Sequence, residues 1–369
     1  MKNFSPRSSS LHHNITSSPH YQTMKNGKLL FLVSLFFLPL FSEAQDIHFS
    51  QLTETPLLLN PALAALSHNF MAVVNYKDQW KSVCNNPFKT FNVSADMAFF
   101  KKQSGSRMGA GIDFFSDKAG DAAMGTTTGQ LHLSGVIALN DKNLISAGVY
   151  GGFGQRSLSY DKLYWDNQYV GGALDLTAPS MEPTTFANRT YADMGAGLAW
   201  FYGKGHNTLS SNDQASFTAG FSVQHLNQPV YTFYGNPDAK LPMKMVAHGN
   251  ADIGVKNYSL ILEPGYIVMI QGGHHEINAG MLFKYLMQEA SHYTGRKKPA
   301  AFVLGAYYRF GDAANLVAAY EMDSFRVGFS YDINLSNLDI ASKARGGFEV
   351  SLRYMMTDDG NNKNKGFFN

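Results

Sequence analysis

The chain has 369 residues, of which 44% are hydrophobic and only 16% are charged. A typical soluble domain has about 25% charged residues, so this composition argues against an ordinary soluble protein. The first 44 residues hold four Lys or Arg against one acid, which leaves 26 against 27 in the remainder, a net charge of −1. A nearly neutral mature chain gives no reason to expect nucleic acid as a partner. The single cysteine, Cys84, excludes an intrachain disulfide.

The N-terminal region has the features of a secretory signal peptide over residues 24–44. Two lysines precede an apolar run from Leu29 to Phe41, and small residues flank the end at Ala44. The run is shorter than the roughly 20 residues of a transmembrane helix. We predict cleavage after Ala44, and we interpret residues 1–23 as an over-called extension that precedes the true start.

Beyond Ala44 the dominant pattern is alternation of apolar and polar residues with a period of two. From Phe325 to Leu335, apolar side chains occupy the odd positions, and polar residues or glycine occupy the even positions. Successive side chains of a strand point to opposite faces, so such segments have one greasy and one polar face. We predict strands near 70–80, 89–101, 107–115, 126–139, 143–155, 191–202, 214–225, 243–254, 257–269, 274–286, 301–310, 314–322, 324–335 and 346–356.

These strands predict an all-β fold: a transmembrane, up-and-down antiparallel β-barrel of about 14 strands over residues 70–356. Many of them are 9–13 residues long, which suits tilted membrane strands of about 9–11 residues better than soluble strands of about 5–6. A secreted, soluble β-sandwich or barrel is the alternative. Residues 45–69 then form a periplasmic lead-in segment, and residues 357–369 form a polar tail.

The connections between strands largely alternate between short and long. Very short turns are predicted at Asp141, Lys256 and Asp323, and the longest connection runs over residues 156–190. Short periplasmic turns and long outer loops are typical of such barrels. Segments 203–213 and 287–300 break the alternation, so either a strand pair is miscounted or these segments have a role on the inner side.

Charged residues on the polar face of the last two strands form a candidate network in the lumen. Arg326, Asp332, Glu349 and Arg353 alternate with outward apolar residues. They are interpreted either as a salt-bridge network that stiffens the barrel or as the lining of a pore. A charge at outward-facing Phe329 or Leu352 is expected to cost about 2–4 kcal/mol near the midplane, whereas the same change at inner-face Ser330 or Ser351 is expected to be much milder.

No spacing in the chain indicates catalysis, a metal or a cofactor. His274 and His275 are adjacent, so in a strand they point to opposite faces and cannot converge on zinc. The acids from Asp113 to Asp121 lack calcium-loop spacing and are interpreted as a solvated turn. We therefore expect no enzyme activity, no cofactor and no catalytic residues.

Several motifs resemble those of the PorP/SprF family of type IX secretion system outer-membrane proteins. They are Phe49-Ser50-Gln51, Pro56-Leu57-Leu58-Leu59-Asn60-Pro61-Ala62, Asn75-Tyr76-Lys77-Asp78-Gln79-Trp80, Tyr331-Asp332-Ile333-Asn334-Leu335 and Gly347-Phe348-Glu349-Val350-Ser351-Leu352-Arg353-Tyr354. The resemblance extends over nearly all of the mature chain in the expected order. Its signature is weaker over residues 156–300.

The resemblance implies an integral outer-membrane barrel of Bacteroidetes that supports secretion, surface delivery or anchoring of proteins with C-terminal sorting domains, including gliding adhesins. It implies contacts with outer-membrane lipid, with other secretion components on the periplasmic side and with a secreted adhesin. The segment before the first strand either folds into the lumen or docks a periplasmic partner, and its candidate partner-binding residues are Phe49, Gln51, Asn60 and Pro61. A passive outer-membrane pore or small-molecule channel is the alternative function.

Overall fold

A computed structural model of the chain describes residues 46, 48–51, 53–81, 84–182, 188–204, 214–233, 236–288, 299–336 and 343–357. The predicted extension 1–23, the signal peptide 24–44 and the tail beyond residue 357 lie outside these residues and stay predictions. Within the described residues, no helix is long and apolar enough to cross a membrane.

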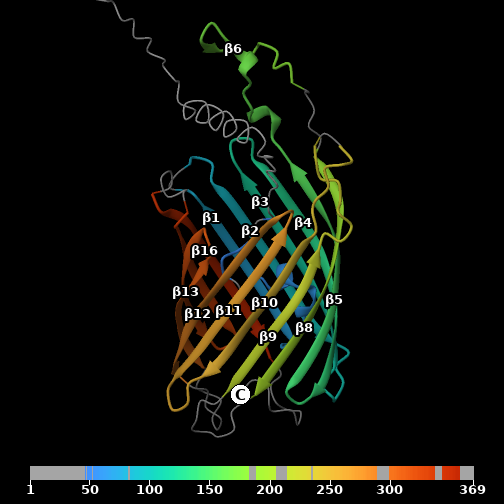
Figure 1. Cartoon of the computed structure of the whole chain (residues 1–369), viewed down its shortest axis with the longest axis vertical. Coiled ribbons are helices and arrows are strands. Elements are labelled where there is room, and N and C mark those ends of the chain that lie inside the picture. Colours follow the sequence, from blue (N-terminus) through green and yellow to red (C-terminus); the bar gives the residue numbers. More distant parts are fainter. Residues whose placement is uncertain are drawn as a thin grey trace, which may run out of the picture. The chain divides into compact units, whose positions relative to one another are not determined.

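Fourteen antiparallel strands close into one barrel, as the sequence predicts (Figure 1). Each strand pairs with its neighbours in the chain, and β1 closes the ring against β16 over ten residue pairs. The strands are β1 (Phe70–Gln79), β2 (Phe88–Phe99), β3 (Arg107–Ala119), β4 (Met124–Asn140), β5 (Asn143–Ser157), β8 (Arg189–Lys204), β9 (Ala215–Gln224), β10 (Lys244–Gly254), β11 (Leu260–Gln271), β12 (His274–Gln288), β13 (Ala300–Arg309), β14 (Ala313–Met322), β15 (Phe325–Asn334) and β16 (Arg345–Met356).

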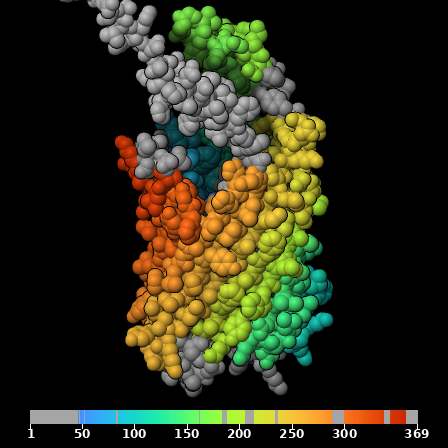
Figure 2. All heavy atoms as spheres, in the orientation of Figure 1, coloured from blue at the N-terminus to red at the C-terminus, as the bar shows by residue number. Residues whose placement is uncertain are grey.

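The alternating pattern separates a lipid face from a lumen face along each strand. On β15, the side chain of Phe329 is 56% exposed, whereas its neighbour Ser330 is 6% exposed. Backbone groups are satisfied between strands, which is the condition for spanning hydrocarbon. The view in Figure 2 shows neighbouring strands packed into a continuous outer wall.

The two ends of the barrel differ in the length of their connections. At the loop end, the β5–β8 connection spans residues 158–188 and contains η2 (Tyr160–Lys162), η3 (Asp166–Gln168), β6 (Tyr169–Val170) and β7 (Ala173–Leu174). At the opposite end, called the base, β1 begins and β16 ends. The predicted short turns at Asp141 and Asp323 lie at the base.

The 14-strand closure shows that no strand pair was miscounted. Most of segments 203–213 and 287–300 lies outside the described residues, so a role for them on the inner side stays a prediction.

The interpretation of the acids from Asp113 to Asp121 as a solvated turn was wrong for Asp113 and Asp117. Strand β3 continues to Ala119, and its inward-facing Asp113 and Asp117 are buried. Asn92 Nδ2 donates to Asp113 Oδ1 at 2.7 Å, and Thr90 Oγ1 donates to Asp117 Oδ1 at 2.7 Å. Partners on β2 therefore bind one oxygen of each carboxylate that the isolated sequence assigns to water.

Candidate functional site: a chain segment inside the barrel

The candidate site is the surface between the barrel wall and the described residues 46, 48–51 and 53–69, here called the lumen segment. It includes two short helical turns, α2 (Pro56–Leu59) and η1 (Pro61–Leu63). Each turn has proline in its first turn, where the missing N–H costs nothing. Asn60 lies between the turns and caps the second, because its Oδ1 accepts from Ala62 N at 2.9 Å.

The lumen segment runs from the loop end to the base. Asp46 N donates to Gln271, the last residue of β11, and Asn69 N donates to the carbonyl of Met356, the last residue of β16. Between these points, the segment makes hydrogen bonds or ion pairs with side chains or backbone carbonyls of β1–β4, β8–β13, β15 and β16. The segment is thus attached around most of the inner wall. Of the two sequence alternatives, this arrangement corresponds to folding into the lumen.

At the loop end, Asp46 and Asp193 hold the ring of His225 between two carboxylates. His225 Nε2 lies 2.7 Å from Asp46 Oδ2, and Nδ1 lies 2.9 Å from Asp193 Oδ1. Burial alone lowers the pKa of His225, but the hydrogen bonds to Asp193 and Asp46 raise it to about 9. Burial also opposes ionisation of Asp46, yet His225, Lys244 and Gln271 hold its pKa below the ordinary value. The bridge is therefore an ion pair at neutral pH.

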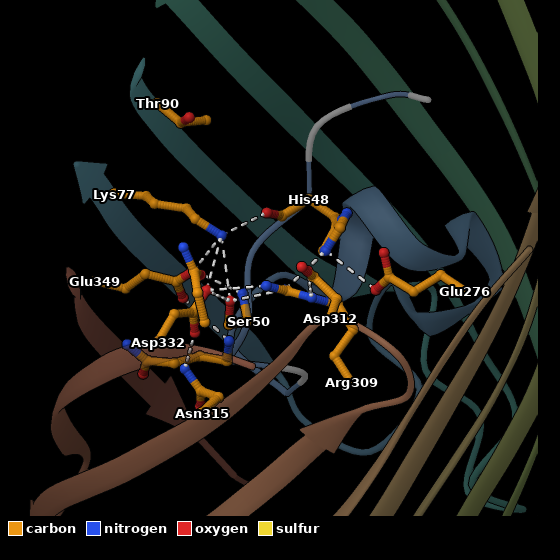
Figure 3. Close-up of polar contacts among 12 residues, drawn as sticks. His48, Ser50, Lys77, Thr90, Glu276, Arg309, Asp312, Asn315, Asp332 and Glu349 are labelled. Carbon is orange, nitrogen blue, oxygen red and sulfur yellow. Dashed lines mark hydrogen bonds and ion pairs between the residues drawn. The ribbon is translucent and has the colours of Figure 1, made fainter. Parts of the chain in front are cut away.

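A second cluster fixes Ser50 and Gln51, and Figure 3 shows its contacts to Ser50. Glu349 accepts from the backbone N–H groups of both residues, at 2.7 and 3.1 Å. Lys77 Nζ lies 2.9 Å from the same carboxylate and 3.7 Å from Asp332, to which Ser50 Oγ donates at 2.9 Å. Lys77, Asp332 and Glu349 are each 2% exposed. Buried charges persist only when they are paired and hydrogen-bonded, and here the lumen segment supplies part of that pairing.

Arg309 joins this cluster from β13. Its Nη2 donates to Asp332 at 3.3 Å, and its Nε donates to Asp312 at 2.6 Å. Nearby, His48 has a pKa well below its ordinary value because of burial and the positive charges of Lys77, Arg309 and Lys244. His48 is therefore neutral, and Arg309 Nη1 lies 3.3 Å from its Nε2.

A third cluster surrounds Glu54 toward the base. Its Oε1 lies 3.3 Å from Arg326 Nε and 3.2 Å from Arg353 Nη1. Both arginines also contact Glu321, at 2.7 and 3.6 Å. Lys284 pairs with Glu321 and lies 3.9 Å from Glu263, so three cations face three carboxylates. A cavity of about 300 Å³ opens beside this cluster, between the lumen segment and strands β8–β16.

Glycines in the wall form the sockets that hold the helical turns. A Cβ at Gly148 would lie 2.5 Å from Ala62 N, and one at Gly197 would lie 2.1 Å from Asn60 Oδ1. Asn60 Nδ2 donates to the carbonyl of Leu198 at 2.9 Å. Any larger residue at these glycines would displace the lumen segment, so wall and segment are shaped to each other.

The last part of the lumen segment is held by polar side chains of β2, β3 and β4. Asp96 accepts from Ala65 N at 2.7 Å and pairs with His68. Ser134 Oγ donates to the carbonyl of Ala64 at 2.7 Å. Arg107 Nη2 donates to the carbonyl of Leu66 at 2.8 Å. These contacts place the chain at the base, where it enters β1.

The structure places the predicted lumen residues together with residues that the sequence analysis did not select. Arg326 and Arg353 share Glu54 and Glu321, whereas Asp332 and Glu349 share Lys77 and Ser50. The predicted set therefore forms two clusters rather than one. Their partners Glu54 and Lys77 were not predicted. Lys77 could have been found, because it lies in a family motif and at an inward-facing position of the alternating pattern of β1.

The four predicted partner-binding residues, Phe49, Gln51, Asn60 and Pro61, are all buried in the lumen. Gln51 Oε1 accepts from Ser351 Oγ at 2.7 Å. Partner binding by these residues stays a prediction, and it requires the lumen segment to leave its place.

Comparison with known proteins decides the family. The sequence model described as type IX secretion system membrane protein PorP/SprF matches residues 41–354. The chain belongs to the PorP/SprF family. As a PorP/SprF barrel, it is an integral protein of the outer membrane. A search of curated proteins gave no match.

Several solved outer-membrane barrels are similar in fold. BamA from Haemophilus ducreyi lacking POTRA domains 1–3 has 11% identity and a TM-score of 0.39, with 78% of this chain and 70% of that chain covered. CdiB from Acinetobacter baumannii has 5% identity and a TM-score of 0.38, with 78% and 60% covered. The translocator domain of autotransporter NalP from Neisseria meningitidis has 8% identity and a TM-score of 0.31, with 92% and 96% covered.

Proposed function

We propose that this PorP/SprF protein is a closed, non-enzymatic barrel that supports secretion, surface delivery or anchoring of exported proteins with C-terminal sorting domains. The observation that carries the proposal is the occupied lumen. A general pore needs a water-filled interior, whereas here the wall binds a segment of its own chain through buried charges and glycine sockets. The polar inner face is thus used for internal binding, and the passive-pore alternative loses its main support.

The deciding experiment is deletion of the gene in the native host, followed by proteomics of the culture medium and the cell surface. Loss from the cell surface of one exported protein with a sorting domain would indicate a dedicated partner such as an adhesin. Loss of many would indicate a general component that works with other secretion proteins on the periplasmic side. An unchanged exported profile together with reduced uptake of small solutes would overturn the proposal in favour of a pore.

Conductance of the purified full chain in planar bilayers provides a second test. The occupied lumen predicts no steady open-channel current. A stable conductance comparable to that of a porin would contradict the closed barrel, even if the exported profile changes on deletion.

The proposal also places the loop end outside the cell, because the longest connection lies there and both ends of the barrel domain lie at the base. The lumen segment would then bring the mature N-terminus to the cell surface. An epitope inserted before Asp46 is expected to bind antibody on intact cells, whereas the same epitope in the turn at Asp141 is expected to bind only after lysis. The reverse pattern would invert the orientation.

A further inference from the structure

The β5–β8 connection is an ordered structure with its own contacts over residues 158–182, here called the loop platform (green in Figure 1). Tyr160 Oη lies 2.9 Å from Ser180 Oγ, and Asn167 Nδ2 donates to the carbonyl of Ser180 at 3.1 Å. The rings of Tyr160 and Trp165 pack with centroids 5.8 Å apart. These contacts join the two limbs of the connection, as in compact surface loops that often have a function.

The loop platform presents apolar side chains outward. Leu176 is 65% exposed, and the side chains of Tyr164, Tyr169 and Val170 are each 57–58% exposed. Met181 is 79% exposed. Lipid accounts for exposed apolar side chains on the strands, but these residues lie outside β5 and β8 in the connection between them. Large exposed apolar side chains on an ordered loop outside the membrane indicate a surface that another molecule covers.

The charge of the loop platform limits what that molecule is. Residues 158–182 contain Asp161, Asp166, Asp175 and Glu182 against Lys162, a net charge of −3. A lipid surface that carries phosphate groups would repel this charge, and so would the same loop platform of a second copy. A protein surface with lysine or arginine around apolar side chains is complementary in both respects.

We propose that the loop platform is the docking surface for an exported polypeptide whose own surface carries basic residues around an apolar centre. The inference rests on the proposed function, since it names the surface of this barrel that holds the exported protein. Apolar contact at Tyr169, Val170 and Leu176 supplies the affinity, and the surrounding acids orient the partner.

The test uses the full chain, returned to the deletion strain of the native host. In the first variant, Tyr169→Ser, Val170→Ser and Leu176→Ser are combined. In the second, Asp166→Lys and Glu182→Lys change the net charge of the platform from −3 to +1. Both acids are exposed, and neither side chain makes a hydrogen bond to another described residue. Tyr258→Ser, in the base turn between β10 and β11 and 69% exposed, is the matched control.

For both variants we expect the exported proteins that depend on this barrel to move from the cell surface to the medium. Their surface-to-medium ratio should fall by a factor of about ten or more. Tyr258→Ser should behave as wild type. The barrel itself is expected to stay in the outer membrane with heat-modifiable gel migration. If the serine variant fails this check, the charge variant decides the outcome.

Retention of the exported proteins by a folded variant would overturn the loop platform as their docking surface. If deletion of the whole gene also leaves the exported profile unchanged, the proposed function fails as well. The deletion strain thus separates failure of the function from failure of the loop platform alone.

Discussion

Replacement of Gly148 by valine tests directly whether the lumen segment is built into the barrel. A Cβ at this position would lie 2.5 Å from Ala62 N and from Pro61 C, whereas ordinary contact begins at 3.4 Å. The turn at Pro61 must therefore retreat by about 1 Å. Overpacking of this kind costs about 1–3 kcal/mol. The shift also strains the hydrogen bonds of Asn60 to Ala62 and Leu198, at about 0.5–1.5 kcal/mol each.

The expected total is a loss of about 2–6 kcal/mol in the free energy of unfolding. Gly151→Val is the matched control, because it lies on the same strand, faces outward and would meet nothing within 4 Å. It also reproduces the gain in strand propensity from glycine to valine, which is at most about 1 kcal/mol.

The assay is urea unfolding in lipid vesicles, followed by the folded fraction in heat-modifiable electrophoresis. Bilayer conductance of both variants would show whether displacement of the segment opens the lumen. Equal stability of the Gly148 and Gly151 variants, within about 0.5 kcal/mol, would refute the packing of the lumen segment against β5.

Three further predictions concern charge. Lys77→Met leaves Glu349 buried without its cation and should lower the free energy of unfolding by about 3–5 kcal/mol in the urea assay. Adding Glu349→Gln should restore part of this loss. A loss below about 1 kcal/mol would show that the cluster is solvated. Phe329→Lys places a charge in lipid and should cost about 2–4 kcal/mol near the midplane, against little for Phe329→Leu; equal costs would invert the assigned faces. The folded pKa of His225, about 9, lies above its ordinary 6.5, so the ion pair with Asp46 stabilises fully below pH 6.5 and is lost as pH rises through about 9. Protease cleavage of the lumen segment should therefore accelerate from pH 7 to pH 10 in wild type but not in His225→Gln, and a flat wild-type profile would contradict the bridge.

The acidic limit of the same bridge follows from Asp46. Its pKa is held below the ordinary 3.8, so its contribution is present above that pH and is lost as pH falls below it. The bridge therefore contributes fully between about pH 4 and pH 6.5, and it weakens as the pH moves out of that range on either side.

The sequence by itself determined the barrel. Strand number, strand order and the lipid face follow from alternation, because a period of two is a local property and one shifted residue would put apolar side chains in the lumen. The outward position of Phe329 and the inward position of Glu349 were both predicted on this basis and are confirmed by their burial. The family motifs are likewise local and were recognised from the sequence.

Only the tertiary structure decided what occupies the lumen. The inner face of a strand is polar whether it meets water or a polar chain, so the pattern cannot distinguish the two cases. The milder effect expected for a charge at Ser351 than at Leu352 stays a prediction, and the structure adds that Ser351 is fully buried and donates to Gln51. The need for glycine at positions 148 and 197 is likewise visible only in the structure, where the lumen segment lies too close for a side chain. The contact between Ser50 and Glu349 joins residues 299 positions apart. The closed ring brings such residues together, and no local pattern in the chain encodes which inner-face side chains the lumen segment meets.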